Sequence, residues 1–317
     1  MEAPQDPATP QASELEGLAN DLIARSYRPS TILNYKHRVR NFALFLEGLK
    51  VSRRMPIPSY HVALYLAYLS KEGYAPGTLK LALSAISWYH KMSGAPDPTT
   101  APAIQRMIIG AKEKAPPPKK LHPISRSILH AMVAQVPFLP LSDYMQKLTK
   151  ALLLLGYHAC ARVGELLVSS NADHTLKMEN IHFSHEEGKI SFRFTLPSYK
   201  HSKEEASFVL EPAYDQAWCP VRHLISFLKE RGTGPGYLFL STEGHPIKRE
   251  FLANQIQALA GRLGLEKEKY NTHSLRIGRT TDMAAEGESE ATIKQTGRWH
   301  SSAHLDYVRC PAFVLPQ

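Results

Sequence analysis

Three short stretches near the end of the chain decide how the fold is interpreted: Asn271-Thr272-His273-Ser274-Leu275-Arg276, then Thr296-Gly297-Arg298-Trp299-His300, then Tyr307-Val308-Arg309. His273 and Arg276 are three residues apart, so on a helix both side chains point in the same direction. A guanidinium beside a second nitrogen donor suits a phosphate, because its planar fork matches two phosphate oxygens. A tyrosine that follows after another helix and turn can act as a nucleophile on that phosphate. A surface helix followed by a core tryptophan and a core tyrosine has the same pattern, and these stretches alone leave both interpretations open.

Length and composition indicate a globular protein with a polyanionic partner. The chain has 317 residues, of which 43% are hydrophobic and 21% charged, so it is long enough to bury the cores of two domains. Its formal net charge of +9 favours DNA or RNA as a partner over a membrane or an acidic protein.

The cysteines and the apolar runs predict an intracellular protein without a membrane partner. Cys160, Cys219 and Cys310 lie far apart and lack metal-ligand spacing, so we expect reduced, mostly buried thiols. The first residues contain neither the apolar core of a secretory signal nor an Arg-rich transit pattern. The longest apolar run, 151–156, is far too short to span a bilayer. We therefore expect a soluble, basic protein.

A basic helical module is predicted near the N-terminus. Residues 1–20 are rich in Pro, Gln and Ala and are expected to form a flexible tail. Between 21 and 114, apolar side chains recur every three or four positions, which predicts helices. Residues 21–120 contain 16 Lys and Arg against 5 Asp and Glu, a surplus of +11 that favours a DNA-binding surface over an ordinary solvated face. The candidate DNA-binding residues of the whole chain are Arg28, Lys36, Arg38, Arg40, Lys80, Lys119, Lys120 and Lys200.

A linker at 115–122 is predicted to separate this module from a second domain at 123–317. Three consecutive prolines exclude helix there and are followed by two lysines. Helical periodicity predicts helices at 125–136, 141–158, 220–231 and 251–263, and the second is apolar enough to be buried. Short strands are predicted at 178–183, 189–196 and 206–210. The predicted fold is mainly α with a small antiparallel β-sheet: an N-terminal helical domain and a C-terminal mixed α/β domain.

More charged side chains precede the C-terminal stretches. Arg162 directly follows the apolar helix, and Glu165 is its local partner at i+3; alone, this pair is more often structural than functional. Lys200 and Lys203 lie in the polar connection between the last two predicted strands, where lysines are common. The order of all these motifs along the chain is informative: Arg with Glu, a lysine hairpin, His-x-x-Arg, Trp-His and a terminal Tyr.

That order resembles the tyrosine recombinase (phage-integrase) family, in the form carried by eukaryotic mobile elements. The resemblance rests on Ala161-Arg162-Val163-Gly164-Glu165-Leu166, His273-Ser274-Leu275-Arg276-Ile277-Gly278, Gly297-Arg298-Trp299-His300-Ser301 and Tyr307-Val308-Arg309. The lysine hairpin and Cys219-Pro220-Val221-Arg222-His223-Leu224 also look like the mobile-element versions. The resemblance covers nearly the whole chain, because residues 21–114 look like the family's core-binding domain and residues 123–317 like its catalytic domain.

The resemblance implies a role for each residue of the catalytic set. Tyr307 would attack the scissile phosphate and leave a 3′-phosphotyrosine and a free 5′-hydroxyl. Arg162 and Arg276 would bind the non-bridging oxygens as charge develops in the transition state. His273 would accept a proton or donate a hydrogen bond, and Glu165 would orient Arg162.

The same resemblance assigns the remaining positions. A hairpin lysine would protonate the 5′-oxygen leaving group, and Lys203 is favoured over Lys200. Either Trp299 or His300 would contact the phosphate. Because the covalent ester conserves the energy of the phosphodiester, neither ATP nor a metal is expected, and no cofactor is predicted.

The predicted function is site-specific DNA recombination or integration by a homotetramer on double-stranded DNA, encoded by a mobile element and located in the nucleus if the host is eukaryotic. One alternative is a type IB topoisomerase, which uses nearly the same residues and relaxes DNA as a monomer. Another is a domesticated DNA-binding protein that no longer catalyses the reaction.

Overall fold

The structure is a computed structural model that describes residues 12–117, 120–168, 175–186, 188–196 and 206–309. It divides into two compact units, Met1–Pro118 and Lys119–Gln317. The division lies within the segment that the prolines single out as a linker.

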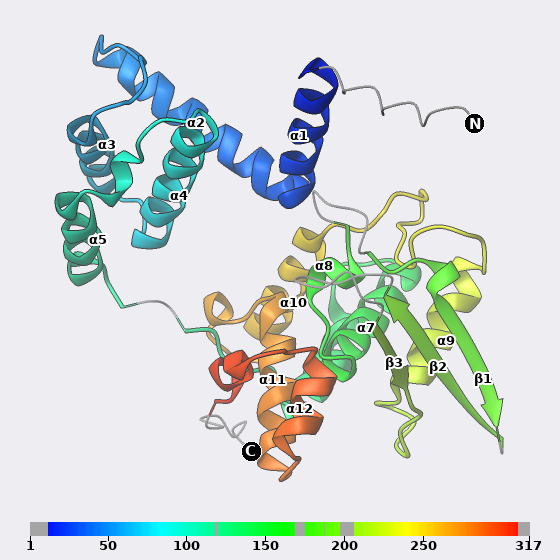
Figure 1. Ribbon diagram of the computed structural model, residues 1–317. Helices are drawn as coiled ribbons and strands as arrows, with labels where there is room; N and C mark the ends of the chain where they lie inside the picture. The colour runs from blue at the N-terminus through cyan, green and yellow to red at the C-terminus, as the bar shows by residue number, and fades with distance from the viewer. Residues whose placement is uncertain (1–11, 118–119, 169–174, 187, 197–205, 310–317) are drawn as a thin grey trace, which may run out of the picture. The chain divides into compact units, whose positions relative to one another are not determined.

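The first unit consists of helices around one apolar core (Figure 1). Its elements are α1 (Ala12–Ser26), α2 (Pro29–Gly48), α3 (Ser59–Lys71), α4 (Pro76–Met92), the short 3-10 helix η1 (Pro98–Thr100) and α5 (Pro102–Lys114). Proline occupies the first turn of α2, α4 and α5, where no intrahelical hydrogen bond is lost. The core is formed by α2 to α5 and includes Phe42, Leu46, Val62, Leu66 and Ile86.

Helix α1 corrects the predicted flexible tail. Residues 1–11 lie outside the described residues, but residues 12–20 belong to α1. Leu15, Leu18 and Leu22 recur at helical spacing, and Glu14 lies in the first turn, where it favours the helix dipole. The three leucines are 49%, 55% and 61% exposed, so the apolar stripe of α1 is not packed into the described core.

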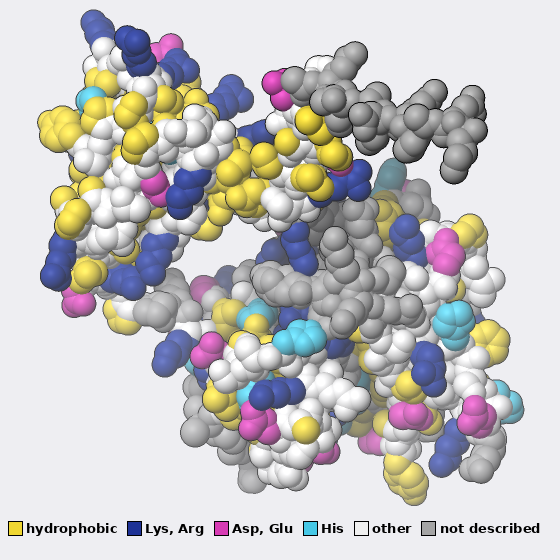
Figure 2. Space-filling view, viewed as in Figure 1, with side chains coloured by type: hydrophobic (Ala, Val, Ile, Leu, Met, Phe, Trp, Pro, Cys, Tyr) yellow, Lys and Arg dark blue, Asp and Glu magenta, His cyan; other side chains and the backbone are white. Residues whose placement is uncertain are grey.

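Basic side chains are spread over the surface of the first unit. Figure 2 shows Lys and Arg distributed over its visible face with fewer Asp and Glu among them. Of the candidate DNA-binding residues, Arg28, Lys36 and Arg40 are exposed on α2 or at its N-cap. Arg38 is partly buried, and its Nε donates to Asn34 Oδ1 at 2.8 Å.

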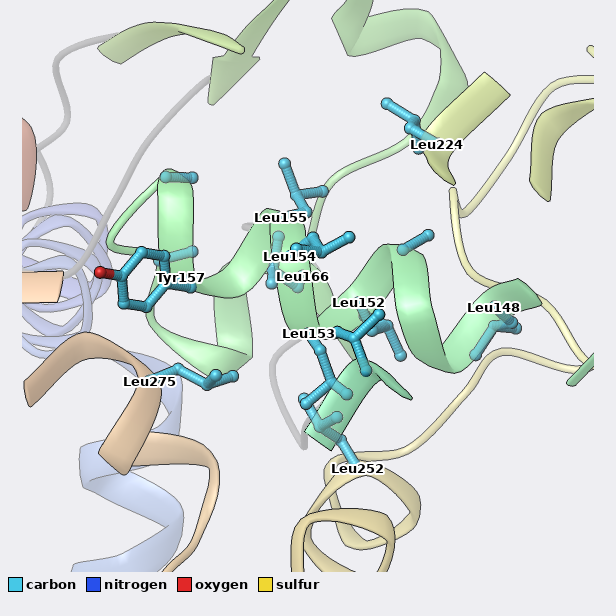
Figure 3. Close-up of a cluster of buried hydrophobic side chains, with 14 of the residues drawn as sticks. Leu148, Leu152, Leu153, Leu154, Leu155, Tyr157, Leu166, Leu224, Leu252 and Leu275 are labelled. Carbon is cyan, nitrogen blue, oxygen red and sulfur yellow. The ribbon is translucent and has the colours of Figure 1, made fainter. Parts of the chain in front are cut away.

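The second unit is built around one buried helix. Its helices are α6 (Arg126–Gln135), α7 (Asp143–His158), α8 (Val163–Leu166), α9 (Pro220–Arg231), α10 (Arg249–Arg262), α11 (Thr272–Ala285) and α12 (Glu290–Gly297). Short 3-10 helices are η2 (Val136–Phe138), η4 (Met178–Asn180), η5 (Lys267–Lys269) and η6 (Ser302–Tyr307). Figure 3 shows the leucines of α7 surrounded by Leu166, Leu224, Leu252 and Leu275, which come from α8, α9, α10 and α11. The predicted burial of this apolar helix is confirmed.

Three strands form one antiparallel sheet in the order β1 (Ile181–Glu186), β2 (Lys189–Leu196) and β3 (Ala206–Leu210). Phe192 pairs with Phe183 on one side and with Leu210 on the other. The mainly α fold with a small antiparallel sheet is confirmed, although β1 begins later than predicted because residues 178–180 form η4. Within the described residues, no helix is both long and apolar enough to cross a membrane.

Candidate active site

The beginning of α11 is held in place by two features of its own motif. Asn271 caps the helix: its Oδ1 accepts from His273 N at 2.8 Å, and its own N–H donates to Ser274 Oγ at 3.1 Å. Gly278 allows the backbone of Ile124 to approach, because a Cβ at position 278 would lie 1.7 Å from the Ile124 carbonyl oxygen. His273 and Arg276 therefore project from a fixed helix.

Arg276 connects two motifs that are far apart in the sequence. Its side chain is fully buried, and its two terminal nitrogens donate to the carbonyl oxygens of Cys160 and Gly297. The Nε of Arg276 is buried and has no acceptor among the described residues. Arg276 thus joins the turn before α8 to the end of α12 and keeps donor capacity for a further oxygen.

Two aromatic rings lie against this guanidinium. Its central carbon is 4.0 Å from the centre of the Trp299 ring and 5.4 Å from the centre of the Tyr307 ring. The Tyr307 ring centre is 5.0 Å from that of Trp299 and 5.0 Å from that of His273. His273, Arg276, Trp299 and Tyr307 therefore form one group, whereas His300 is exposed.

Glu165 is the anionic centre of a second group. Its Oε1 accepts from Arg162 Nη1 at 3.0 Å, and its Oε2 accepts from the Arg162 backbone N–H at 2.9 Å. The same Oε2 also accepts from Arg298 Nη2 at 2.6 Å. The Glu165 side chain is 4% exposed, so it is a buried carboxylate shared by two guanidinium groups.

A threonine attaches the tyrosine segment to α11. The Thr281 hydroxyl donates to the Tyr307 carbonyl oxygen and accepts from the Arg309 backbone N–H, both at 3.1 Å. These two hydrogen bonds fix the backbone on both sides of Val308 and hold the Tyr307 ring next to Arg276 of the same chain.

The site carries an excess of positive charge. Arg162, Arg276 and Arg298 surround one carboxylate, Glu165. Burial lowers the pKa of Arg276 from its ordinary value; Arg162 and Arg298 lower it further, while Glu165 opposes the shift. A bound anion would relieve this repulsion, so the arrangement suits a phosphate.

The described residues do not include every residue predicted for the site. Lys200 and Lys203, the two candidates for the general acid, lie outside the described residues, as does Lys119. Lys120 is exposed. Lys80 lies beside Lys112 of α5, and its interaction with the neighbouring Lys112 amine lowers the pKa of Lys80.

Three residues that contact predicted site residues were absent from the sequence-based set: Arg298 beside Glu165, Thr281 beside Tyr307, and Lys112 beside Lys80. Arg298 lies inside a quoted motif, yet nothing local distinguishes a buried arginine there from an exposed one. Thr281 and Lys112 have no sequence signal, because their partners come from other elements. Within the described part of the chain, no cluster of three or more His, Cys, Asp or Glu side chains could hold a metal ion.

Comparison with known proteins identifies the class. Residues 134–308 match the phage integrase family, and residues 15–93 match the phage integrase N-terminal SAM-like domain. The first match covers more than half of the chain, so the protein belongs to the phage integrase family of tyrosine recombinases. It is a site-specific recombinase with a catalytic domain that breaks and rejoins DNA. No curated protein matches the sequence.

Solved structures of low sequence identity share the fold. The XerH site-specific recombinase bound to difH substrate is 16% identical, with 87% of this chain and 76% of that chain covered and a TM-score of 0.59. A lambda integrase dimer bound to a COC′ core site is 15% identical, with 96% and 79% covered and a TM-score of 0.60. The Tn1549 transposon integrase in complex with circular intermediate DNA is 13% identical, with 93% and 94% covered and a TM-score of 0.58.

Proposed function

We propose that Tyr307 attacks a phosphate of double-stranded DNA and forms a 3′-phosphotyrosine during site-specific strand exchange. The observation that carries this proposal is the position of Arg276, whose buried guanidinium lies 5.4 Å from the Tyr307 ring centre. A cation beside a tyrosine ring allows both side chains to engage one phosphate, the cation binding its oxygens and the tyrosine hydroxyl attacking its phosphorus.

In the proposed step, a bond forms between the Tyr307 oxygen and phosphorus while the bond from phosphorus to the 5′-oxygen breaks. His273, whose ring lies beside Tyr307, accepts the phenol proton or donates a hydrogen bond. Arg162 and Arg276 stabilise the charge on the non-bridging oxygens. Lys203 donates the proton that the departing 5′-oxygen needs. Attack of a 5′-hydroxyl on the phosphotyrosine then reverses these steps and rejoins the strands.

Of Trp299 and His300, we propose that Trp299 contacts the scissile phosphate. Its ring lies against Arg276 and Tyr307, whereas His300 is exposed. The indole would cover one side of the bound phosphate, exclude water from the phosphotyrosine and offer its N–H as a donor.

The experiment that tests the proposed function uses a nicked suicide duplex, from which the 5′-hydroxyl fragment is lost after cleavage. Incubation with a library of such duplexes followed by denaturing electrophoresis should reveal a covalent protein–DNA adduct, whose sequencing gives the target site. Absence of any adduct from the wild-type protein would instead favour a DNA-binding protein that has lost catalysis.

We further propose that the chain acts as a homotetramer on DNA, each site cutting one strand. The exposed leucine stripe of α1 supports assembly, because an apolar helix face of this kind is normally covered by a partner. Replacing Leu15 and Leu22 with Ser should reduce tetramers on DNA in native mass measurements, while Glu16→Gln in the same helix should not.

The source and location are part of the same proposal. The resemblance of the segments Cys219-Pro220-Val221-Arg222-His223-Leu224 and Lys200-His201-Ser202-Lys203 to mobile-element versions supports an origin in a eukaryotic mobile element. A protein with a chromosomal DNA substrate would act in the nucleus of such a host, which immunofluorescence of a tagged protein tests.

A further inference from the structure

Arg298 adopts a backbone conformation that few residues other than glycine tolerate. It is the C-cap of α12, with φ 55° and ψ 52° in the left-handed region. A non-glycine residue there is strained and persists when surrounding contacts hold it. The Arg298 side chain is only 7% exposed, so its contacts lie inside the protein.

Those contacts come from separate parts of the catalytic domain. Arg298 Nη2 donates to Glu165 Oε2 at 2.6 Å, and Nη1 lies 3.3 Å from the carbonyl oxygens of both Ala159 and Thr296. The guanidinium carbon is 5.6 Å from the centre of the Phe208 ring on β3, the strand that follows the lysine hairpin. Arg298 therefore connects the end of α7, α8, the end of α12 and the sheet.

The most consequential partner is Glu165. Arg298 and the Arg162 backbone N–H hold one carboxylate oxygen, which leaves the other for the Arg162 side chain. A carboxylate fixed in this way cannot rotate, so it presents the Arg162 guanidinium in one orientation. Because Arg298 shares the negative charge of Glu165, Arg162 also keeps more of its positive charge for a phosphate.

The backbone of Arg298 has a second consequence. Its left-handed conformation turns the chain so that Trp299 packs against Arg276, while the Gly297 carbonyl accepts from that same arginine. A Cβ at Gly297 would lie 1.7 Å from the Trp299 ring, so the ring packs directly over the preceding backbone. One residue thus influences both arginines that would bind the phosphate.

We infer that Arg298 is a positioning residue, which aims Arg162 through Glu165 and so sets the positive charge available to the scissile phosphate. It does not touch the DNA. This inference rests on the proposed function, because it assigns Arg298 to the neutralisation of phosphate charge in that reaction.

The test compares two suicide duplexes, one with an ordinary scissile phosphodiester and one with a methylphosphonate at that position. The methylphosphonate has no negative charge, so its cleavage depends little on correctly aimed cations. Arg298→Ala should slow adduct formation from the phosphodiester roughly 10- to 100-fold, the range found when groups that orient a charged centre are removed. On the methylphosphonate this defect should largely disappear.

Variants that keep the fold make the test decisive. Arg298→Lys retains the charge and should recover part of the phosphodiester rate, and Glu165→Gln should show the same dependence on substrate. Because both residues act through one interaction, the double variant Arg298→Ala with Glu165→Gln should be no slower than the slower single variant. Arg231→Ala is the matched control, since the hydrogen bonds of the Arg231 side chain to described residues go to carbonyl oxygens between residues 232 and 238.

Rates are taken per folded molecule, with DNA affinity and urea unfolding measured for each variant. A loss of equal size on both substrates for Arg298→Ala and Arg298→Lys, with the wild type active on both, overturns the inference and leaves the proposed function intact. A wild-type protein that forms no adduct with either duplex overturns the proposed function and the inference with it.

Discussion

Replacing Arg276 with lysine removes the shape of the side chain and keeps its charge. The guanidinium donates to the carbonyl oxygens of Cys160 and Gly297 from two different nitrogens, and its central carbon also lies 4.0 Å from the centre of the Trp299 ring. Lysine has one nitrogen at the end of its side chain, so it cannot bridge both carbonyl groups and present a planar fork to a phosphate as well.

The expected losses follow from these contacts. One buried carbonyl group left without a donor costs about 1–3 kcal/mol of folding stability. Loss of the bidentate contact to the transition state costs about 3 kcal/mol, which corresponds to roughly a hundredfold in the rate of adduct formation. Arg276→Lys should therefore be moderately destabilised and strongly impaired in cleavage.

Single-turnover adduct formation with excess protein measures the cleavage rate, and urea unfolding measures the stability. Arg231→Lys is the matched control, because Arg231 also bridges several carbonyl oxygens but lies at the end of α9. It should lose stability and keep its rate per folded molecule. If Arg276→Lys cleaved as fast as the wild type, the guanidinium geometry would have no part in the reaction and the reasoning would be refuted.

DNA binding, protonation of the leaving group and acid stability give three more expectations. Neutralising Lys36 and Arg40 should weaken binding to all DNA sequences and reduce the slope of log affinity against log salt by about 1.8, measured by fluorescence anisotropy. Lys203→Ala should cripple cleavage of ordinary DNA but not of DNA with a bridging 5′-sulfur, because a thiolate leaves without a proton; Lys200→Ala should have much less effect. Burial and neighbouring arginines lower the pKa of His158 from 6.5 to about 4. The unfolded chain therefore binds an extra proton between these values, and stability should fall by about 3 kcal/mol as the pH drops through this window. His158→Asn should remove that loss in urea unfolding.

Each of these expectations has a contrary result. Affinity that does not change with salt would contradict a DNA-binding surface. Equal defects of the two lysine variants, or sulfur rescue of Lys200→Ala alone, would move the general acid to Lys200. An unchanged acid sensitivity of His158→Asn would assign that sensitivity to other groups.

Local patterns were sufficient to predict most of the fold. The sequence of α7 predicted a buried helix because apolar residues occupy nearly every side of it toward its end. The sequences of β2 and β3 predicted strands with the bounds that the structure has. The Pro- and Gln-rich residues at the start of the chain favour a tail over residues 1–20, although Leu15 and Leu18 continue the helical spacing of Leu22. An exposed helix also has no fully buried face, so its apolar pattern is a weaker signal for helix prediction.

The site was partly accessible from the sequence. Helical geometry predicted that His273 and Arg276 face one object, and both side chains lie beside the Tyr307 ring. Arg298 was missed because its burial depends on Glu165, which lies 133 residues earlier, and on a left-handed turn. Such a contact is a property of the packed domain rather than of the motif.

The central claim is that Tyr307 is the nucleophile, and Tyr307→Phe tests it most directly. The substitution removes one oxygen and keeps the ring that packs on Trp299 and His273, so folding and DNA affinity should barely change. Denaturing electrophoresis with a suicide duplex should show no adduct for Tyr307→Phe, a trace for Arg276→Ala and a full adduct for the control Tyr237→Phe. An adduct that survives Tyr307→Phe would contradict the account.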